Sequence, residues 1–592
     1  MQNAVAFANN DVVVVAWSYG HKLTGCMGFA IYRIDANNKE TALPSMAVFP
    51  GFKRKAGQTT ADFPIQKFYW KDPYARLVAD KTGSRKFRYK VVPLEGQPGS
   101  LKPMSIGFVI SNEVEISPRV GDGLMAYFNR GLISTQRVSN AFKGNPSKTK
   151  LLDLVADPKQ ALRKSLAGDM ISALLTFVAR TDKGGTLYAA LYELGDSQLI
   201  DALKGPGKKL HLVLSNSGPS EAQKKNGIED GNTDSRAALH ATARQVFDRT
   251  LPTNQIGHNK FVIYVGKNGK ARAVLFGSTN WTSTGLCAQT NNTIVSESST
   301  LAARYLLYWK KLAADTQAAA ADPKALQAAP LRTWDATSKT IQIDGGAATS
   351  WFSPNTPALR KSKTTGEQRP LDMEQVAGLI AGANKAVLFL AFYPGSPSVA
   401  NWTAQLQKAK KDVFVRGCVT NPNTAEAFLY ELKGQTPPKK VKGSPPGKQD
   451  PRVIQAQALS STIPAGWRKE LLSAGFAVTH DKIVVIDPFS DDCVVITGSH
   501  NLGHKASYNN DENLIIVKGQ RQLAQAYATH VLDVYDHFSW RWTVQRDGQA
   551  KADTKLEVKP DVWQSRYFDA AGNIKVAQLR FWLGAIPAAP GP

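Results

Sequence analysis

The chain has 592 residues, 43 % of them hydrophobic and 20 % charged, which is enough for several domains and typical of a globular protein. No apolar run approaches the roughly 18 residues of a membrane-spanning helix, and the N-terminus lacks the features of a secretion signal. These observations argue against membrane-embedded and conventionally secreted proteins. We expect a cytoplasmic location, or export by a dedicated machine. The net charge of +25, from 73 basic and 48 acidic residues, favours an anionic partner such as nucleic acid or phospholipid headgroups.

The four cysteines follow neither a disulfide pattern nor a metal-binding pattern. No C-x-x-C pair occurs among Cys26, Cys287, Cys418 and Cys493. We therefore expect buried, reduced thiols. No cluster of acidic residues, or of His and Cys, stands at metal-ligand spacing, so the sequence predicts a protein that needs neither metal nor cofactor.

Residues 1–122 are typical of β-strands separated by turns. The segments rich in Val, Ile, Phe and Tyr are DVVVVAWSY, GFAIYRID, FRYKVVPLEG and SIGFVISNEVEIS. Trp17 and Tyr89 resemble the core Trp and the later-strand Tyr of immunoglobulin-like and fibronectin type III domains. We interpret this region as an all-β sandwich of that kind, with a packing or targeting role.

From about residue 123 the pattern changes to alternating helices and strands. It runs from the helical QALRKSLAGDMISALLTFVART through GTLYAALYEL (strand) and SQLIDALKG (helix) to KLHLVLS (strand). The alternation restarts after an Ala-rich helical stretch, with a boundary near residue 340. We therefore expect two α/β regions, 123–340 and 341–592, each with a parallel or mixed sheet covered by helices. The lysine-rich stretch 433–451 is typical of a mobile loop.

Two segments place the same polar residues around strand-like apolar runs. In residues 258–281, HNKFVIYVGKNGKARAVLFGSTNW, these residues are His258, Lys260, Gly277, Ser278 and Asn280. In residues 480–503, HDKIVVIDPFSDDCVVITGSHNLG, they are His480, Lys482, Asp487, Gly498, Ser499 and Asn501. Because burial of charged groups is costly, such residues at strand ends indicate a functional site.

The spacing between the two segments is constant. The histidines are 222 positions apart, and the paired serines and asparagines are 221 apart. The register continues to Asn292 and Asn513, which are also 221 apart, each before an apolar run. A long period that occurs once predicts two halves of a duplicated domain.

The paired residues suit phosphodiester cleavage. Across a pseudo-twofold axis, one imidazole can attack phosphorus while the other protonates the leaving group. Two lysines, with Ser and Asn side chains, form a cage of donors for a tetrahedral anion. The chemistry predicted from these residues is metal-free transfer through a phosphohistidine.

These motifs resemble those of the phospholipase D superfamily, whose signature H-x-K-x4-D followed by G-S-x-N occurs twice. The second copy matches in full, whereas the first has Val265 in place of Asp, a residue that is usually structural in the family. The resemblance covers about residues 125–545. It implies an α/β fold of two pseudo-twofold-related α/β/α sandwich halves, here preceded by the all-β sandwich.

The family also carries N-x-E further along the chain, matched by Asn510 and Glu512. The first half has Gln289 and Asn291 at the equivalent positions. The site residues expected on these grounds are His258, Lys260, Ser278, Asn280, His480, Lys482, Asp487, Ser499, Asn501 and Glu512.

The difference between Glu512 and Asn291 predicts different roles for the histidines. A carboxylate raises the pKa of a neighbouring imidazole more than an amide does. We expect Glu512 to orient His480, which would then be protonated and act as the general acid. We expect Asn291 to lie beside His258, which would then stay neutral and act as the nucleophile. Tyrosyl-DNA phosphodiesterases, which the chain resembles through this superfamily, show a similar split between amide and carboxylate.

Two enzyme classes compete for the substrate. Two motifs in one chain are typical of lipid-acting members, which favours a monomeric phospholipase D that releases phosphatidic acid and a headgroup at a membrane surface. The charge of +25 instead favours a nuclease. A third alternative is a catalytically impaired member that acts as a binding protein. Candidates to line an acyl site or stack on bases, although more typical of core, are Phe389, Phe392, Tyr393 and Trp402.

Overall fold

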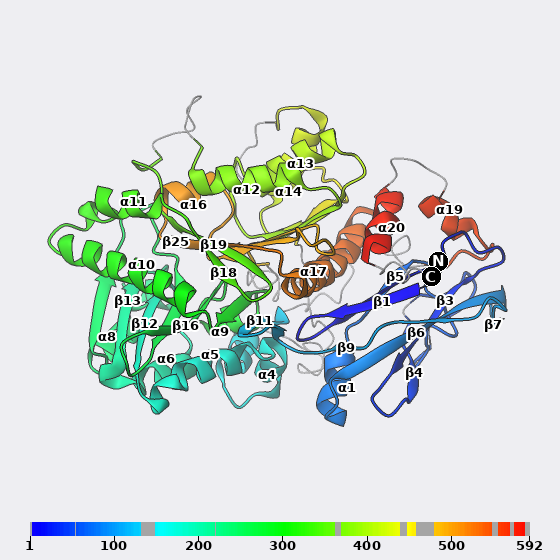
Figure 1. The fold of residues 1–592 in the computed structure, drawn as a ribbon, viewed down its shortest axis with the longest axis horizontal. Helices are drawn as coiled ribbons and strands as arrows, with labels where there is room; N and C mark the ends of the chain where they lie inside the picture. The colour runs from blue at the N-terminus through cyan, green and yellow to red at the C-terminus, as the bar shows by residue number, and fades with distance from the viewer. Residues whose placement is uncertain are drawn as a thin grey trace.

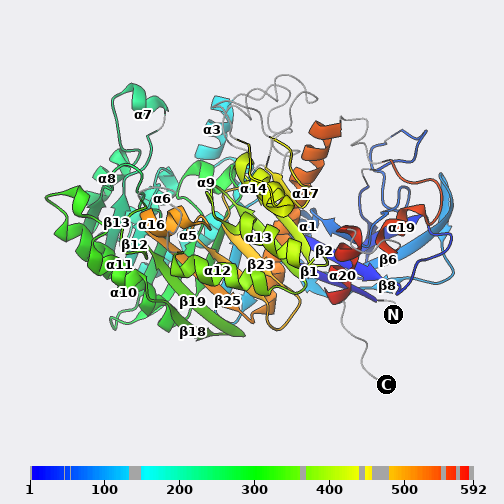
Figure 2. The same ribbon diagram turned by 90° about the horizontal axis from the view of Figure 1, so that it is seen from above.

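The computed structural model describes most of the chain. The described residues are 3–45, 47–53, 55–131, 148–219, 221–360, 369–438, 447–456, 479–547, 555–568 and 574–585. Part of the lysine-rich stretch predicted to be a loop, residues 439–446, lies outside them. The molecule is elongated, with a β-rich region at one end and two α/β halves beside it (Figures 1 and 2).

The N-terminal region contains two antiparallel sheets. Their strand orders are β1-β2-β5 and β4-β3-β6-β7, with β8 and β9 also paired to β6. The bounds are β1 Asn3–Ala8, β2 Val13–Ser18, β3 Gly28–Ile34, β4 Glu40–Ala42, β5 Tyr69–Asp72, β6 Lys86–Gln97, β7 Ser100–Pro103, β8 Val109–Ile110 and β9 Val114–Glu115. Trp17 and Tyr89 are buried in its core, as predicted. The helix α1 (Ala75–Thr82) shows that the region is not purely β, and its likeness to fibronectin type III remains an interpretation.

The first half is built on an eight-stranded sheet in the order β10-β11-β17-β16-β15-β12-β13-β14. Its strands are β10 Arg119–Gly121, β11 Leu124–Phe128, β12 Thr186–Leu191, β13 Leu210–Ser215, β14 Gln245–Arg249, β15 Lys260–Val265, β16 Ala271–Gly277 and β17 Asn292–Ser296. Its helices are α3 Lys148–Ala156, α4 Ala161–Ala167, α5 Met170–Val178, α6 Ser197–Lys204, α7 Glu221–Lys225, α8 Thr233–His240, α9 Ser283–Cys287, α10 Ser299–Ala318 and α11 Ala329–Asp335.

The second half repeats this topology strand by strand, in the order β18-β19-β25-β24-β23-β20-β21-β22. Its strands are β18 Lys339–Ile343, β19 Gly346–Ser353, β20 Ala386–Ala391, β21 Phe414–Val419, β22 Val453–Gln455, β23 Ile483–Ile486, β24 Val494–Gly498 and β25 Glu512–Lys518. Its helices are α12 Leu371–Gly382, α13 Val399–Ala409, α14 Pro422–Lys433, α16 His504–Asn509 and α17 Arg521–Asp547. In both halves the three strands at one end are parallel and the others antiparallel, which confirms the predicted mixed sheets.

Helices cover both faces of each sheet. The long helices α10 and α17 share one apolar core with the inner faces of both sheets (Figure 1). On the outer faces, α4, α5 and α6 pack on the first sheet, and α12 and α13 pack on the second. The structure therefore confirms the duplicated α/β/α architecture.

Two segments link the β-rich region to the halves. The predicted boundary at 122/123 falls in the turn between β10 and β11, both of which belong to the first-half sheet. The C-terminal helices α19 (Val562–Phe568) and α20 (Ile574–Ala585) return to the β-rich region, where Trp563 and Leu579 join its core. That residues 1–122, 123–340 and 341–592 form three folding units therefore stays a prediction.

The remaining sequence predictions concern single residues and spans. All four cysteines are buried and free, as expected. Within the described residues, no helix combines the length and apolar character that crossing a membrane requires.

Candidate active site

His258 and His480 face one another where the two halves meet. Each stands two positions before a lysine, and Lys260 opens β15 while Lys482 directly precedes β23. Both imidazoles are buried, and their ring centroids lie 6.3 Å apart. The fold thus brings together the two predicted motifs.

Main-chain bridges between the halves hold this arrangement. Thr290 pairs in parallel with Thr479, and Ile256 pairs in parallel with Asn510. The His480 N–H donates to the Thr290 carbonyl at 3.0 Å. The backbone of each half therefore holds the segment that carries the histidine of the other half.

The ring orientations also depend on the opposite half. Glu512 Oε2 lies 2.8 Å from His258 Nδ1, and Asn291 Oδ1 lies 2.9 Å from His480 Nδ1. The predicted partners, Glu512 with His480 and Asn291 with His258, are therefore wrong. Glu512 begins β25 and Asn291 directly precedes β17, and both strands start at the boundary, so these side chains reach across it.

The hydrogen bonds assign the imidazole tautomers. Nδ1 of each ring faces an oxygen acceptor, so Nδ1 carries the proton and Nε2 keeps its lone pair in the neutral ring. Asn510 Nδ2 donates to Glu512 Oε1 at 3.0 Å and fixes this carboxylate. This contact gives a physical reason for the N-x-E spacing.

The two motif lysines are held in equivalent ways. Lys260 Nζ donates to the His258 carbonyl at 2.7 Å, and Lys482 Nζ donates to the His480 carbonyl at 2.6 Å. Both lysine side chains are buried. Each ammonium thus keeps further N–H donors for an anion.

Two aromatic rings that the motifs do not include support the site. Lys260 Nζ lies 5.1 Å from the centre of the Tyr192 ring, and Lys482 Nζ lies 5.1 Å from that of Phe392. The same rings pack on the histidines, with centroids 5.1 Å apart for Tyr192 and His258. Their shared position, directly after β12 and β20, is the sequence signal that reveals this pair.

The other aromatic candidates lie elsewhere. Phe389 and Trp402 are in the core of the second half, as their apolar surroundings suggested. Tyr393 is instead 52 % exposed. Of the four, Phe392 contacts a motif histidine, with ring centroids 4.7 Å apart for Phe392 and His480.

Ser278 and Ser499 hold the strands that orient the histidines. Ser278 Oγ accepts from the Asn292 N–H at 3.0 Å, and Ser499 Oγ accepts from the Asn513 N–H at 3.0 Å. Ser278 also donates to Asn291 Oδ1 at 2.9 Å, which positions the acceptor for His480. These hydroxyls are therefore committed to protein partners.

The motif asparagines keep unused hydrogen-bonding capacity. Asn280 Oδ1 and Asn501 Oδ1 are buried and have no hydrogen-bond partner. Asn280 Nδ2 donates to Glu193, a half-buried carboxylate that sequence reasoning missed. Glu193 follows β12 directly after Tyr192, where no repeated motif marks it.

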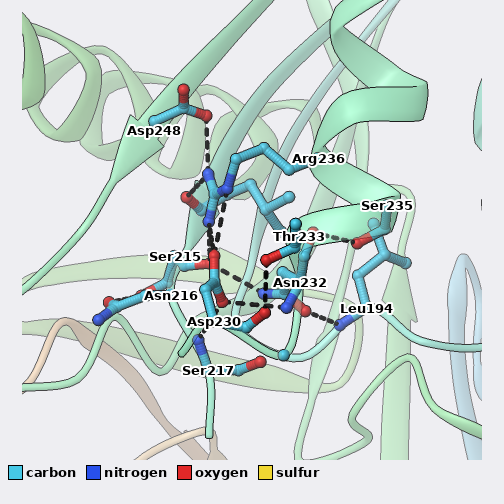
Figure 3. Close-up of polar contacts among 12 residues, drawn as sticks. Leu194, Ser215, Asn216, Ser217, Asp230, Asn232, Thr233, Ser235, Arg236 and Asp248 are labelled. Carbon is cyan, nitrogen blue, oxygen red and sulfur yellow. Dashed lines mark hydrogen bonds and ion pairs between the residues drawn. The ribbon is translucent and has the colours of Figure 1, made fainter. Parts of the chain in front are cut away.

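A polar network holds the loop that carries Glu193 (Figure 3). Asn232 Nδ2 donates to the Tyr192 carbonyl at 2.5 Å and to the Ser215 carbonyl at 2.8 Å. Asn232 Oδ1 accepts from the Leu194 N–H at 3.0 Å. The network continues through Asp230, Arg236 and Asp248. The first-half rim of the site is thus built on a fixed scaffold.

Burial and the lysines keep the imidazoles neutral. The pKa of His258 is lowered well below its usual range by burial and, to a smaller extent, by the charges of Lys260 and Lys482. The same three causes lower the pKa of His480 well below its usual range. Burial also raises the pKa of Glu512 to about 7 and lowers that of Lys260 to about 8. An anion between the lysines would oppose their effect on the imidazoles.

Asp487 directly follows β23, at the end of the strand that is farther from His480. Its carboxylate accepts backbone N–H bonds from Asn384, Lys385 and Ala386 at 2.7 to 2.9 Å. It thereby ties the start of β20 to the end of β23. This is a structural role, in line with the resemblance.

In the first half, the corresponding junction between the start of β12 and the end of β15 is made with glycines. Gly184 and Gly185 precede β12 with φ of 89° and 93°. A Cβ on Gly185 would lie 2.3 Å from the Val265 carbonyl, so only glycine permits this approach. The Tyr264 hydroxyl donates to the Gly184 carbonyl at 2.8 Å. Backbone packing thus replaces the missing Asp.

The repeated fold and the paired His-Lys motifs define a phosphodiesterase-type enzyme with one composite site. Residues 376–534, which include the second motif, match the family described as "Cardiolipin synthase, PLD-like domain". The match lies within the second half and shows a phospholipase D-like domain over those residues.

Three solved structures illustrate the range of similar folds. A phosphatidylserine synthase from Haemophilus influenzae has 10 % identity and a TM-score of 0.41, over 65 % of this chain and 92 % of its own. A yeast tyrosyl-DNA phosphodiesterase has 12 % identity and a TM-score of 0.30, over 57 % of this chain and 85 % of its own. The phospholipase D family member Nuc from Salmonella typhimurium has 17 % identity and a TM-score of 0.19, over 28 % of this chain and 86 % of its own. No curated protein matches the chain.

Proposed function

We propose that the protein is a phospholipase D that cleaves glycerophospholipids through a phosphohistidine. The products are phosphatidic acid and the free headgroup, or a new phosphatidyl ester when an alcohol replaces water. The observation that carries the proposal is the pair of facing histidines with unlike Nδ1 acceptors, set beside two buried lysines.

His258 is the proposed nucleophile. Its Nε2 lone pair attacks phosphorus, forming a P–N bond while the bond to the headgroup oxygen breaks. The phosphorylated ring carries a positive charge, which the Glu512 carboxylate at Nδ1 stabilises. The expected role is therefore retained, but the carboxylate and not the amide supports it.

His480 is the proposed acid and base. The Asn291 amide orients its ring but stabilises the imidazolium less than a carboxylate would. Once a bound phosphate offsets the charges of Lys260 and Lys482, His480 takes up a proton at Nε2 and gives it up readily to the leaving oxygen. The neutral ring then takes a proton from water or an alcohol, which attacks phosphorus and releases His258.

The motif lysines and asparagines are the proposed phosphate cage. Lys260 and Lys482 supply N–H donors to the non-bridging oxygens, whose charge changes during transfer. The second N–H of the Asn280 amide and the N–H groups of the Asn501 amide are the proposed further donors of the cage, since their Oδ1 atoms can only accept. Both histidines belong to one chain, so we propose a catalytically complete monomer.

Glu193 supports a lipid substrate over nucleic acid. Its carboxylate accepts from Asn280. Burial raises the pKa of Glu193, whereas the charges of Lys260 and Lys482 and the Asn280 hydrogen bond oppose that rise and favour the charged carboxylate. A nucleic-acid strand would bring adjacent phosphates to this rim and meet repulsion, whereas a simple phospholipid carries one phosphodiester. The net charge of +25 favours the alternative, a nuclease, so the test must include DNA.

The test compares both substrates without divalent metal. Purified protein in EDTA is incubated with mixed phospholipid vesicles and, separately, with plasmid and single-stranded DNA, with His258→Asn as the control. Phosphatidic acid from lipid, absent with the variant, is expected. DNA cleavage without lipid cleavage would establish the nuclease instead. A catalytic requirement for Mg²⁺ or Ca²⁺ would refute metal independence, and inactivity on both would favour a binding protein.

A further inference from the structure

The two rims of the active site differ in charge. Glu193 stands two positions after the end of β12, and Tyr393 stands two positions after the end of β20. Glu193 is half-buried, whereas Tyr393 is 52 % exposed. A carboxylate therefore borders the proposed phosphate cage in the first half, where the second half has an aromatic ring. In a duplicated site, such a difference suits a substrate whose two ends differ in charge.

The backbone on both sides of Glu193 is fixed. Asn232 Oδ1 accepts from the Leu194 N–H at 3.0 Å (Figure 3), and Asn232 Nδ2 donates to the Tyr192 carbonyl at 2.5 Å. The Glu193 carbonyl itself accepts from the Trp281 N–H at 3.1 Å. The carboxylate is thus presented on a rigid support, as a preorganised binding group requires.

The protein uses one oxygen of this carboxylate. Asn280 Nδ2 donates to Glu193 Oε2. Across the described ranges of the chain, Oε1 accepts no hydrogen bond and the carboxylate forms no ion pair. The charges of Lys260 and Lys482 act on Glu193, so the carboxylate belongs to the electrostatic surroundings of the cage. Glu193 Oε1 therefore remains available to a donor on the substrate.

Asn280 offers a second unused acceptor at the same place. Its Oδ1 atom is buried without a hydrogen-bond partner, and the residue is 3 % exposed. Because Oδ1 and Nδ2 belong to one amide group, Oδ1 lies next to the contact with Glu193. An unpaired buried acceptor is costly unless a ligand supplies a donor.

The donor that fits this place is a primary ammonium group. Glu193 repels an anion, so its charge opposes binding of a phosphate alone. A primary ammonium carries a positive charge and three N–H donors, and can therefore meet Glu193 Oε1 and Asn280 Oδ1 together. A hydroxyl lacks the charge. A quaternary ammonium lacks the N–H groups and would leave Asn280 Oδ1 unpaired.

We propose that Glu193 and Asn280 Oδ1 bind a primary ammonium group of the substrate, so that the site selects phosphodiesters with an amine-bearing headgroup. The inference rests on the proposed function, because the ammonium belongs to the headgroup that leaves. Glu193 is a specificity-determining residue and makes no bond to phosphorus. Its binding energy should appear in the affinity and in kcat/KM for one class of headgroup.

The first test measures binding with turnover blocked. Glycerophosphoethanolamine, glycerophosphocholine and glycerophosphoglycerol are titrated by calorimetry into full-length His258→Asn protein that melts cooperatively. The ethanolamine diester is expected to bind about tenfold more tightly than the glycerol diester, with the choline diester between them. Equal affinities for the ethanolamine and glycerol diesters, or binding of neither, would overturn the proposal. Equal affinities for the ethanolamine and choline diesters would overturn the role of Asn280 Oδ1.

Glu193→Gln, added to the same protein, removes the charge but keeps an oxygen acceptor for Asn280. The preference for the ethanolamine diester should fall from about tenfold to about twofold or less. Affinity for the glycerol diester should stay the same or rise, because a repelling charge is gone. Equal weakening of all three ligands would show that Glu193 only positions Asn280, and would overturn its role in selection.

Asp201→Asn is the matched control. Asp201 lies on α6 in the same half, is exposed, and pairs with Lys204 at 2.9 Å. Its replacement removes the same charge away from the cage, so the preference among the three diesters should be unchanged. A loss of preference equal to that in Glu193→Gln would show a general electrostatic effect and would overturn the site.

Lipid cleavage separates this inference from the proposed function. Initial rates are measured with phosphatidylethanolamine, phosphatidylcholine and phosphatidylglycerol in micelles of a neutral detergent, for the otherwise unchanged protein and for Glu193→Gln. A preference for phosphatidylethanolamine that Glu193→Gln abolishes would support both. Lipid cleavage without any headgroup preference would overturn the inference and leave the phospholipase D. Binding that prefers the amine without any lipid cleavage would refute the phospholipase D and support a site for another amine-bearing phosphodiester.

Discussion

Glu512 and His258 form a contact between the two halves, with Oε2 2.8 Å from Nδ1 although the residues are 254 positions apart. The reciprocal contact joins Asn291 and His480. Neither half therefore contains a fully oriented histidine of its own. The duplication has produced one site that depends on both halves and treats its histidines differently.

The first prediction concerns the carboxylate. Glu512→Gln should lower kcat/KM by about 10²- to 10⁴-fold, because the neutral amide no longer stabilises the charged phospho-ring on His258. Single-turnover kinetics with an activated phosphodiester should show that formation of the intermediate is slowed. A normal rate of formation with slow breakdown would instead place Glu512 with His480.

Asn291→Asp is the matched change on the other side. A carboxylate beside His480 should raise the pKa of this histidine and make it a weaker acid. The loss of kcat/KM should be largest for substrates with poor leaving groups and small for substrates with activated leaving groups. Equal losses for both kinds of substrate would contradict the assigned role of His480.

The pH profile should reflect the same contacts. The pKa of Glu512 is raised to about 7, so the carboxylate that His258 needs is lost as the pH falls through that value. The pKa of Lys260 is lowered to about 8, so a phosphate-binding cation is lost as the pH rises through that value. With a soluble phosphodiester, kcat/KM should therefore peak between about 7 and 8. Glu512→Gln should remove the acidic limb, and its persistence would assign that limb to another group.

Asp487 should matter for stability and not for chemistry. Asp487→Ala leaves the N–H groups of Asn384, Lys385 and Ala386 without their acceptor, which should cost about 2 to 4 kcal/mol of unfolding free energy. The folded variant should keep kcat within about twofold, since Asp487 is remote from the imidazoles. Denaturant unfolding and activity per folded molecule give the two values.

Asp491→Ala controls for loss of charge near Asp487. Its exposed carboxylate pairs with Arg521 at 3.1 Å, so its loss should cost less than about 1 kcal/mol. An equal cost for the two variants would contradict the structural role. A large fall in kcat with Asp487→Ala would contradict the view that this motif position is structural, and with it the view that glycine packing beside Val265 can take the place of the Asp missing from the first half.

The sequence predicted the fold and the motif residues because both rest on local patterns. Apolar periodicity and the constant spacing of 221 or 222 identified two halves, and the functional side chains stand at strand ends. The acceptor for each histidine could not be predicted in this way. Spacing shows that Glu512 and Asn291 are equivalent, but not whether each serves its own half or the other.

Contacts between distant segments were also beyond the sequence patterns. Glu193 and Asn232 belong to no repeated motif, and their roles follow from how loops meet in space. The C-terminal helices have apolar residues typical of any packed helix. Nothing in that pattern indicated that Trp563 would join the core of the β-rich region.

The last prediction concerns the covalent intermediate. If His258 attacks phosphorus, an acid-labile phosphoryl group should form on this residue. His480→Asn should still form it from a substrate whose leaving group needs no protonation, and should then accumulate it, because no base activates the incoming water. His258→Asn should form no adduct. Peptide mapping after trapping without acid locates the label. Label on the His480 peptide would reverse the roles, and label on neither would refute a double displacement through histidine.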